Sequence, residues 1–356
     1  MTTQPVIDTT KTEAFLGKVI GNTGGMTTTI FAAIGDRLGL FKSLAHGPAT
    51  SAQLAARADI NERYAREWLG AMASAGYVEY DSQSQSFTLP PEYVPILAQE
   101  SGPIFLGGLH QMLLGMAGPL ETLVQAFQRG GGVAQANYDE NVWDGMERFT
   151  NGWYENMLVQ QWLPLMPDVQ ERLTRGVSVA DIGCGRGRGI IKLAQSFPCS
   201  RYVGYDVFQP TIDRANANAQ AAGVADRVRF QHLDASHDLP EQYDVITTFD
   251  VVHDAADPRG MLQSIRKALR PDGRYLCLEI NAAETVEGNA GPLGTLFYGF
   301  SILYCMTTSL HNHGEGLGTV GLPESKVREL CIEVGFSSVQ RAPIENPFNS
   351  FFVAIP

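Results

Sequence analysis

The sequence predicts an α/β protein in which a doubly wound, mainly parallel sheet follows a mainly helical N-terminal region. Three observations support this prediction. From residue 177 onward, short β-rich runs alternate with helical stretches, as in a parallel sheet with crossover helices. Before residue 100, the expected elements are a helix, a turn, a helix and a hairpin, which is typical of a winged helix. The 356 residues, 44% of them hydrophobic, suffice for two or three structural units with buried cores.

We therefore expect three parts in the chain. Residues 1–100 form an N-terminal helical, winged-helix domain. Residues 101–170 form a helical connector that contributes to a ligand pocket. Residues 171–356 form the domain that holds the sheet, and within it residues 284–322 form an insertion placed as a lid.

The N-terminal part starts with a helical pattern. Apolar residues at helical spacing predict a helix over residues 25–44, which Gly47 and Pro48 then end. The first eleven residues hold no apolar run, so we expect no secretory signal there. The winged-helix elements expected next are a short helix capped by Thr50, a helix over residues 62–75, and strands over residues 77–80 and 86–89.

The charge of the chain argues against nucleic acid and membrane surfaces as partners. Acidic residues outnumber basic ones by 38 to 26, which gives a net charge of −12. Such a field repels phosphate groups and anionic lipids. On the candidate recognition helix, Glu62 and Glu67 offset Arg63 and Arg66. We therefore expect the winged helix to pair with its own copy in a homodimer rather than to bind DNA.

Cysteine usage and hydropathy indicate the compartment. The five cysteines are odd in number, scattered and without a Cys-x-x-Cys spacing, so we expect reduced thiols in a cytoplasmic protein. Residues 288–314 carry no charge, but their apolar part, residues 293–306, is too short to cross about 30 Å of hydrocarbon. We expect a buried helix or an active-site lid there and no membrane span.

Methionine and aromatic side chains are frequent along the connector. Core packing explains most of them, while a few suit a pocket for an apolar or aromatic ligand, because thioether and ring surfaces adapt to such shapes. These residues are Met112, Met116, Phe127, Trp143, Met146, Phe149, Trp153, Tyr154, Met157 and Trp162.

The sheet domain is predicted from regular alternation. The expected parallel strands cover residues 177–182, 201–206, 227–232, 243–249 and 274–280, with helices over residues 190–196, 210–222 and 258–269. After the lid, a helix over residues 324–334 precedes two strands, residues 337–342 and 348–354. Their short separation, with a turn at residues 346–349, suits an antiparallel hairpin at the sheet edge.

A glycine-rich loop follows the first of these strands. Gly183, Gly185 and Gly187 let the backbone approach a ligand closely at a strand-to-helix turn. The loop contains no Gly-x-Gly-x-x-Gly and no Gly-Lys-Ser/Thr, which argues against a dinucleotide fingerprint and excludes a P-loop. The same run contains Asp181 and Cys184, which we also expect among the ligand-binding residues. The Cys184 side chain is expected to be a small packing group rather than a reactive thiol.

Two carboxylates indicate an adenosine ligand. Asp206, followed by Val207, ends the second strand, where a carboxylate can accept both hydroxyls of a ribose. Asp234, followed by Ala235, comes after the third strand, and its carboxylate can accept a hydrogen bond from the amino group of adenine. Residues that bind ribose and adenine, in a sequence without a phosphate-binding loop, imply S-adenosylmethionine as the ligand.

These motifs resemble a known family. The run Val179–Gly187, the strand-end Asp206, the segment Leu233–Ala235 and the Leu-Arg-Pro-Asp-Gly turn at residues 269–273 are similar to class I S-adenosylmethionine-dependent methyltransferases. Over nearly the whole chain, the similarity is to bacterial small-molecule methyltransferases with an N-terminal winged-helix dimerisation domain. The resemblance implies a seven-stranded sheet whose last strand is antiparallel.

The segment after the fourth strand carries the candidate catalytic residues. His253 can accept a proton from a hydroxyl because its ordinary pKa lies near neutral pH. The resemblance to O-methyltransferases implies that the pair His253-Asp254 supplies the general base and that Glu279 holds the histidine. A further acid of that family has no counterpart at residues 320–322. We expect Phe249 and Asp250 to border the sulfonium side of the cofactor.

Other functions remain open at this stage. Within enzymes, the alternative is N-, S- or C-methylation, in which His253 positions the acceptor without acting as an essential base. The alternative that is not an enzyme is a regulatory protein that binds DNA through its winged helix and binds S-adenosylmethionine only as a signal. A dehydrogenase lacks its glycine fingerprint. His311 and His313, with Glu315 nearby, lack a convincing third ligand, so we predict no metal.

Overall fold

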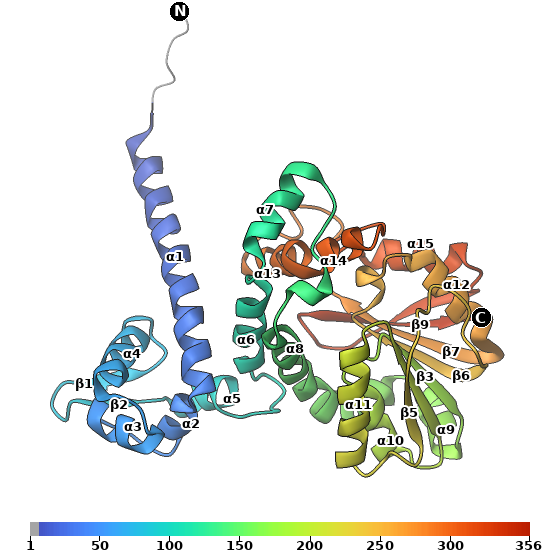
Figure 1. Cartoon of the computed structure of the whole chain (residues 1–356), viewed down its shortest axis with the longest axis horizontal. Coiled ribbons are helices and arrows are strands. Elements are labelled where there is room, and N and C mark those ends of the chain that lie inside the picture. Colours follow the sequence, from blue (N-terminus) through green and yellow to red (C-terminus); the bar gives the residue numbers. More distant parts are fainter. Residues whose placement is uncertain (1–6) are drawn as a thin grey trace, which may run out of the picture. The chain divides into compact units, whose positions relative to one another are not determined.

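The computed structural model describes residues 7–356, and these form two compact units (Figure 1). One unit contains the residues up to Leu114 together with Asp144–Phe149, and the other contains Gly115–Trp143 and Thr150–Pro356. The segment 101–170 therefore contributes to both units. The expectation for the first eleven residues falls partly on residues 1–6, which lie outside the described residues.

The first helix is longer than the sequence pattern predicts and ends earlier. Helix α1 (Thr9–Arg37) starts at Asp8, whose carboxylate accepts a hydrogen bond from the Lys11 backbone N–H. The predicted helix over residues 25–44 is therefore wrong at both ends. Gly39, with φ of 69°, interrupts it, and a separate helix α2 (Leu40–Ala45) follows.

The winged-helix elements form as predicted. Thr50 and Gln53 make a reciprocal capping box at the start of α3 (Ser51–Ala58), and α4 (Glu62–Ser74) follows after a short turn. The hairpin of β1 (Glu79–Asp81) and β2 (Ser86–Thr88) is shorter than predicted. A small core built around Trp68 holds these elements together, and the indole N–H donates a hydrogen bond to the Phe31 carbonyl.

The connector is helical, as expected. Before it, the N-terminal part ends with η1 (Pro91–Tyr93) and α5 (Val94–Leu97). The elements from residue 101 onward, which include a π-helix, are α6 (Gly107–Met116), α7 (Leu120–Arg129), η2 (Gln135–Asn137), α8 (Glu140–Trp153), the π-helix η3 (Tyr154–Trp162), η4 (Leu163–Leu165) and α9 (Pro167–Arg175), the last of which extends past residue 170.

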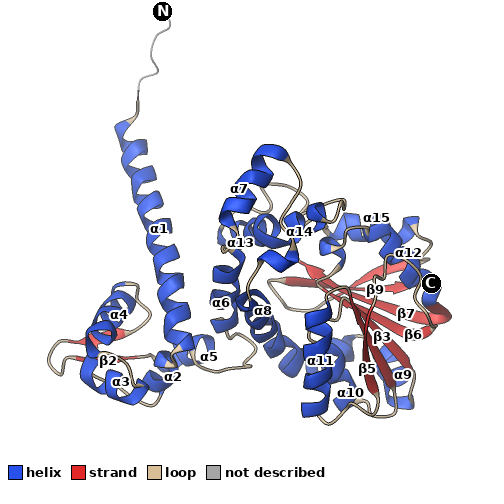
Figure 2. Cartoon of the chain, viewed as in Figure 1, coloured by secondary structure: helices blue, strands red, loops and turns tan. Residues whose placement is uncertain are grey.

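A seven-stranded sheet forms the centre of the second unit, as Figure 2 shows in red. Its strand order is β5-β4-β3-β6-β7-β9-β8. The strands from β5 to β7 are mutually parallel, and β9 runs antiparallel to both of its neighbours, which confirms the predicted topology. The strands are β3 (Ser178–Ile182), β4 (Arg201–Asp206), β5 (Val228–His232), β6 (Tyr243–Phe249), β7 (Leu269–Ile280), β8 (Ser338–Ala342) and β9 (Asn349–Ile355).

The strand order fixes where a ligand can bind. The chain moves outward from β3 to β4 and β5, and then returns to the other side of β3 with β6. In an open sheet, ligands bind outside the carboxyl ends of the strands at such a reversal. The loops after the five parallel strands all reach this edge, because their registers are aligned.

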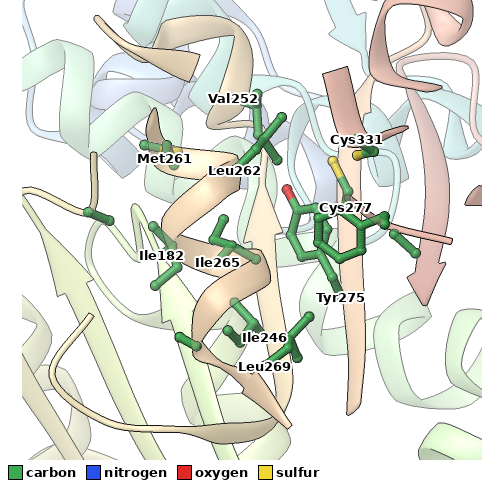
Figure 3. Close-up of a cluster of buried hydrophobic side chains, with 14 of the residues drawn as sticks. Ile182, Ile246, Val252, Met261, Leu262, Ile265, Leu269, Tyr275, Cys277 and Cys331 are labelled. Atoms are coloured by element: carbon green, nitrogen blue, oxygen red, sulfur yellow. The ribbon is translucent and has the colours of Figure 1, made fainter. Parts of the chain in front are cut away.

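Helices cover both faces of the sheet (Figure 2). Helices α10 (Arg188–Ser196) and α11 (Gln209–Ala221) contact β4 and β5, while α12 (Pro258–Ala268) and α15 (Glu324–Glu333) belong to one buried cluster with the central strands. Figure 3 shows the side chains of α12 directed at those of β6 and β7. The cluster includes Ile182, Ile246, Met261, Leu262, Ile265, Tyr275, Cys277 and Cys331.

The predicted lid contains a continuous helical segment. Helix α13 (Pro292–Phe300) passes through a π-helical turn, η6 (Ser301–Cys305), into α14 (Met306–His311). Among the described residues, this 20-residue stretch alone is long and apolar enough to cross a membrane, and half of it is buried inside the protein. A core helix passes the same test, so the stretch is weak evidence for a membrane span.

Candidate active site

The glycine-rich loop turns sharply between β3 and α10. Gly183 and Gly187 have φ of 65° and 78°, and a Cβ atom on either would overlap the side chain of Val251 or Phe230. A Cβ on Gly185 would instead point into open space. Because Gly185 also has a positive φ, of 50°, the backbone conformation favours glycine at all three positions, while space for a side chain is lacking only at Gly183 and Gly187.

Asp206 organises this loop from the next strand. One oxygen of its carboxylate accepts the Gly185 backbone N–H at 2.8 Å, and the other accepts the Phe208 backbone N–H at 2.9 Å. Burial raises the pKa of Asp206, while these two hydrogen bonds oppose the rise. The predicted ribose-binding carboxylate is thus fixed at the carboxyl end of β4, against the glycine loop.

Asp181 lies near the end of β3, just before the loop, and Cys184 lies within the loop. Asp181 is 2% exposed and accepts a hydrogen bond of 2.6 Å from Thr247, and burial raises its pKa to about 7. The Cys184 thiol packs against Gly204, and burial raises its pKa well above the ordinary value. Cys184 is therefore a packing residue and not a reactive thiol.

The residues predicted for the adenosine side differ in exposure. The side chain of Val207 is 54% exposed, and its carbonyl lies 2.8 Å from His232 Nε2. Asp234 is exposed and accepts the Ser236 backbone N–H. The Ala235 methyl group belongs to the hydrophobic core, so only its backbone is available to a ligand.

Asp250 is held in an uncommon conformation after β6. Its φ is 57°, and its carboxylate accepts a hydrogen bond of 2.6 Å from Asn349 of β9. A positive φ in a residue other than glycine costs free energy and persists only where the surroundings enforce it. Burial raises the pKa of Asp250 to about 8, with a further contribution from Glu279. The neighbouring Phe249 ring packs against Tyr154 at 5.4 Å between centroids.

His253 and Glu279 form a deeply buried polar pair at this edge. They are 3% and 1% exposed, and His253 Nδ1 lies 2.5 Å from Glu279 Oε2. The other carboxylate oxygen accepts the backbone N–H groups of Val251 and Val252, at 3.3 and 2.7 Å. Glu279 thus fixes both the imidazole and the turn that carries it, η5 (Val252–Asp254).

The outer nitrogen of His253 faces a second carboxylate. Nε2 lies 3.1 Å from Asp254 Oδ1, and the Cys305 thiol of the lid lies beside both groups. Burial alone would lower the pKa of His253, but the charges of Asp254 and Glu279 outweigh it and raise the pKa well above its ordinary value. The imidazole is therefore a strong proton acceptor held between two acids.

The sequence pattern does not indicate the role of several residues at this edge. The pattern places Asn349 in a turn, whereas it begins β9 and donates a hydrogen bond to Asp250. Tyr154, noted only as a connector aromatic, is near enough to Asp250 and Asp181 for their charges to raise its pKa, after burial. Cys305 carried no sequence signal because it stands in an uncharged helical run far from residue 253.

Two other sequence candidates are not assembled into sites. His311 and His313 are exposed, and Glu315 forms an ion pair with Arg259. On α4, Arg63 and Arg66 form ion pairs with Glu67 and Glu62, as their spacing suggested.

Comparison with known protein families matches two parts of the chain. Residues 180–275 match a family described as a methyltransferase domain, and residues 26–99 match an Rv2258c-like winged HTH domain. The first match spans β3 to β7 and therefore includes the glycine loop, Asp206 and His253. This chain contains a methyltransferase domain.

Curated relatives of the methyltransferase domain act on different molecules. The tRNA 5-carboxymethoxyuridine methyltransferase of Escherichia coli is 32% identical over 152 residues, which cover 40% of this chain and 58% of that protein. The 27-O-demethylrifamycin SV methyltransferase of Amycolatopsis mediterranei is 29% identical over 138 residues, covering 34% and 50%. The chain spans about half the length of these two relatives.

Solved structures match the fold over the whole chain. The mitomycin 7-O-methyltransferase covers 98% of this chain and 100% of its own, with 19% identity and a TM-score of 0.70. Human N-acetylserotonin methyltransferase, in complex with S-adenosylmethionine, covers 100% and 99%, with 15% identity and a TM-score of 0.70. The methyltransferase domain and its fold identify S-adenosylmethionine as the cofactor.

Substituting Asp206→Asn should weaken S-adenosylmethionine binding to the methyltransferase domain by tenfold or more. The amide presents a donor where the carboxylate accepts two backbone N–H groups, and charged hydrogen bonds contribute about 1.5–3 kcal/mol each. Titration calorimetry measures the affinity. Asp213→Asn, an exposed change on α11, is the matched control and should bind as the wild type does. Equal affinity in both variants would show that Asp206 does not contribute to the cofactor site.

Proposed function

We propose that this chain transfers the methyl group of S-adenosylmethionine to a hydroxyl group of a small organic molecule, with His253 as the general base. The observation that carries the proposal is the buried pair of His253 and Glu279 at the carboxyl edge of the sheet. A histidine oriented by a carboxylate beside a cofactor site is the arrangement that proton removal requires.

The residues at the edge fit this cofactor. Gly183, Gly185 and Gly187 would receive its methionine portion, Asp206 and Val207 the ribose, and Asp234 and Ala235 the adenine. Burial raises the pKa values of Asp181, Asp206 and Asp250, so a cation bound among these carboxylates would stabilise their charged forms. S-adenosylmethionine carries a sulfonium and supplies an electrophilic methyl group.

His253 would take the proton of the acceptor hydroxyl on Nε2. Glu279 accepts at Nδ1, which fixes the ring orientation and the tautomer and favours the imidazolium that forms. Asp254 lies on the Nε2 side and adds a second negative charge. As the new carbon–oxygen bond forms and the carbon–sulfur bond breaks, the proton moves from the hydroxyl to the imidazole, so no alkoxide has to form first.

The lid and the connector supply an aromatic surface next to His253. Tyr304 packs edge-on against Tyr138 at 5.1 Å, and its hydroxyl accepts a hydrogen bond from Gln135. Asp254 is near enough to raise the pKa of Tyr304, after burial. This surface favours a small aromatic or otherwise apolar acceptor, in keeping with the relatives named for rifamycin and mitomycin methylation.

The proposed function predicts which acceptors turn over. Release of S-adenosylhomocysteine should occur with phenols and not with matched amines or thiols, and His253→Ala should reduce kcat by 10²-fold or more. The variant must still bind S-adenosylmethionine in calorimetry. The exposed His46→Ala is the matched control and should keep its rate. Turnover of amines or thiols at an unchanged rate in His253→Ala would overturn the base role and reassign the reaction class.

The pKa of His253 also predicts the pH profile. Only the neutral imidazole accepts a proton, and its pKa is raised well above 6.5. The value of kcat/KM should therefore increase with pH through the neutral range, tenfold per unit below the pKa. Asp254→Asn removes a charge that raises this pKa, so its rising limb should move to lower pH. The exposed Asp238→Asn is the control and should leave the rising part of the pH profile unchanged. If Asp254→Asn does not shift the profile either, the assignment of His253 as the base is contradicted.

We also propose a homodimer formed through α1. Phe15, Leu16, Val19, Ile20 and Met26 lie on one face of this helix and are between 44% and 66% exposed. The residues of α1 that are buried in its own chain lie near its C-terminal end and are Ala32, Ala33, Gly35 and Asp36. An apolar stripe of this length is expected to be covered, and a second copy of the helix can do so symmetrically.

Sedimentation tests the dimer. The wild type should sediment at twice the chain mass, and Phe15→Glu should increase the dissociation constant at least tenfold by placing a charge in the apolar stripe. Ile332→Glu, at an exposed apolar residue of the other unit, should remain dimeric. A monomeric wild type would exclude the proposal.

The proposed partners and location follow from charge and cysteine chemistry. The paired arginines of α4 and the net charge of −12 favour a small-molecule acceptor over nucleic acid. The five cysteines are all free thiols, as expected in the reducing cytoplasm. Tight duplex binding at low salt, or recovery of the protein in the membrane fraction of lysed cells, would contradict these assignments.

A further inference from the structure

Three potential metal ligands from distant segments lie together at the carboxyl edge. His253 and Asp254 belong to η5, and Cys305 belongs to η6 in the lid. One ligand atom of each lies within 4.8 Å of the others. His253 and Cys305 are 3% and 6% exposed, so two of the three groups are almost fully enclosed. The sequence offers no hint of this group, because about fifty residues separate its members.

The orientation of the donors is that of a coordination site. Glu279 occupies Nδ1 of His253, which leaves Nε2 to face the other two residues. Nε2 pairs with Asp254 Oδ1 at 3.1 Å, and the Asp254 side chain is 30% exposed. Tetrahedral zinc holds nitrogen and oxygen ligands at about 2.0–2.2 Å, which places two ligands roughly 3.3 Å apart. The two atoms therefore have the separation of neighbouring ligands of one ion.

We propose that His253 Nε2, Asp254 Oδ1 and Cys305 Sγ bind one divalent transition metal ion, with zinc favoured. An imidazole, a carboxylate and a thiolate form a mixed donor set that suits zinc, and thiolate excludes calcium and magnesium. Three protein ligands leave the fourth position of a tetrahedron for water. Glu279 then has the role of the outer carboxylate that orients a metal-bound histidine.

Binding must displace protons from two of the ligands. The Cys305 thiol loses its proton to become a thiolate, and any proton on His253 Nε2 leaves as the lone pair binds the metal; both protons go to the solvent. The affinity is therefore expected to increase with pH. No redox change and no further reactant is involved.

Metal binding would also regulate the proposed reaction. This consequence, unlike the site itself, depends on the proposed function of His253 as the general base. A nitrogen lone pair that binds zinc cannot accept a proton from an acceptor hydroxyl, so the metal-bound form is inactive and a chelator restores activity. The proposed site would thus make methyl transfer sensitive to free zinc.

Direct metal binding tests the site without reference to catalysis. The full chain is freed of metal with a chelator and dialysed against buffered Zn²⁺, and the bound metal is counted by mass spectrometry. We expect one equivalent in the wild type and at least tenfold weaker binding in Cys305→Ser and Asp254→Asn. Glu279→Gln should weaken binding about tenfold through loss of the outer carboxylate. Co²⁺ should give a thiolate charge-transfer band in the wild type that is absent from Cys305→Ser.

A matched variant and a stability measurement control the experiment. Cys331→Ser changes another buried cysteine, which is not one of the three proposed metal ligands, and should bind zinc as the wild type does. Thermal unfolding midpoints show whether each variant is folded. The proposal is overturned if the wild type binds no equivalent of Zn²⁺, or if Cys305→Ser binds it equally well and without loss of the cobalt band.

The two proposals fail in distinguishable ways. If zinc binds as expected but does not inhibit the chelator-treated enzyme, the site stands and the base role of His253 is wrong. If no zinc binds while His253→Ala abolishes methyl transfer to phenols, the base role stands and the metal site is wrong.

Discussion

The buried carboxylate of Glu279 is the interaction on which this edge of the protein depends. It is 1% exposed and accepts three hydrogen bonds, two from the backbone of the turn after β6 and one from His253. Removing one partner of such a buried charge costs about 3–5 kcal/mol, because the remaining charge stays desolvated. Glu279 thus specifies the conformation of the turn as well as the orientation of the imidazole.

The sheet makes this interaction possible by aligning strand ends. Glu279 lies at the carboxyl end of β7, beside the end of β6, because Phe249 pairs with Leu278 in the parallel register. The antiparallel insertion of β9 brings Asn349 opposite Ile280, from where it reaches Asp250. The positive φ of Asp250 is therefore held from two strands: its N–H donates to the Leu278 carbonyl of the adjacent β7, and Asn349 contacts it from β9, the next strand beyond β7.

The features that the sequence predicted are those encoded by short segments. Strand and helix alternation, the glycine turn at Gly183–Gly187 and the strand-end Asp206 each depend on fewer than about ten consecutive residues, and the structure contains them. Helix α1 was predicted too short, because Gly24, Gly25 and the threonines that follow are weak helix formers. The hydroxyl groups of Thr27 and Thr28 donate hydrogen bonds to backbone carbonyls four residues earlier, so these polar groups are paired within the helix.

The features that the sequence could not predict require contacts between distant segments. Asn349 meets Asp250 only because β9 enters the sheet next to β7, and Cys305 meets His253 only because the lid helix packs over η5. The backbone shows how that packing is fixed: the Gly318 N–H donates to the His253 carbonyl, and the Ser309 hydroxyl donates to the Ala255 carbonyl. Neither bond follows from local spacing.

The same electrostatics underlie both roles that we propose for His253. Glu279 and Asp254 place negative charge on opposite sides of the ring. A field of this kind stabilises any cation at Nε2, whether a proton taken from an acceptor or a metal ion. Proton affinity alone needs only the two carboxylates, whereas a zinc site also needs a third protein ligand at coordination distance. Cys305 supplies that ligand. Proton transfer to His253 does not require Cys305, whereas the proposed zinc binding does.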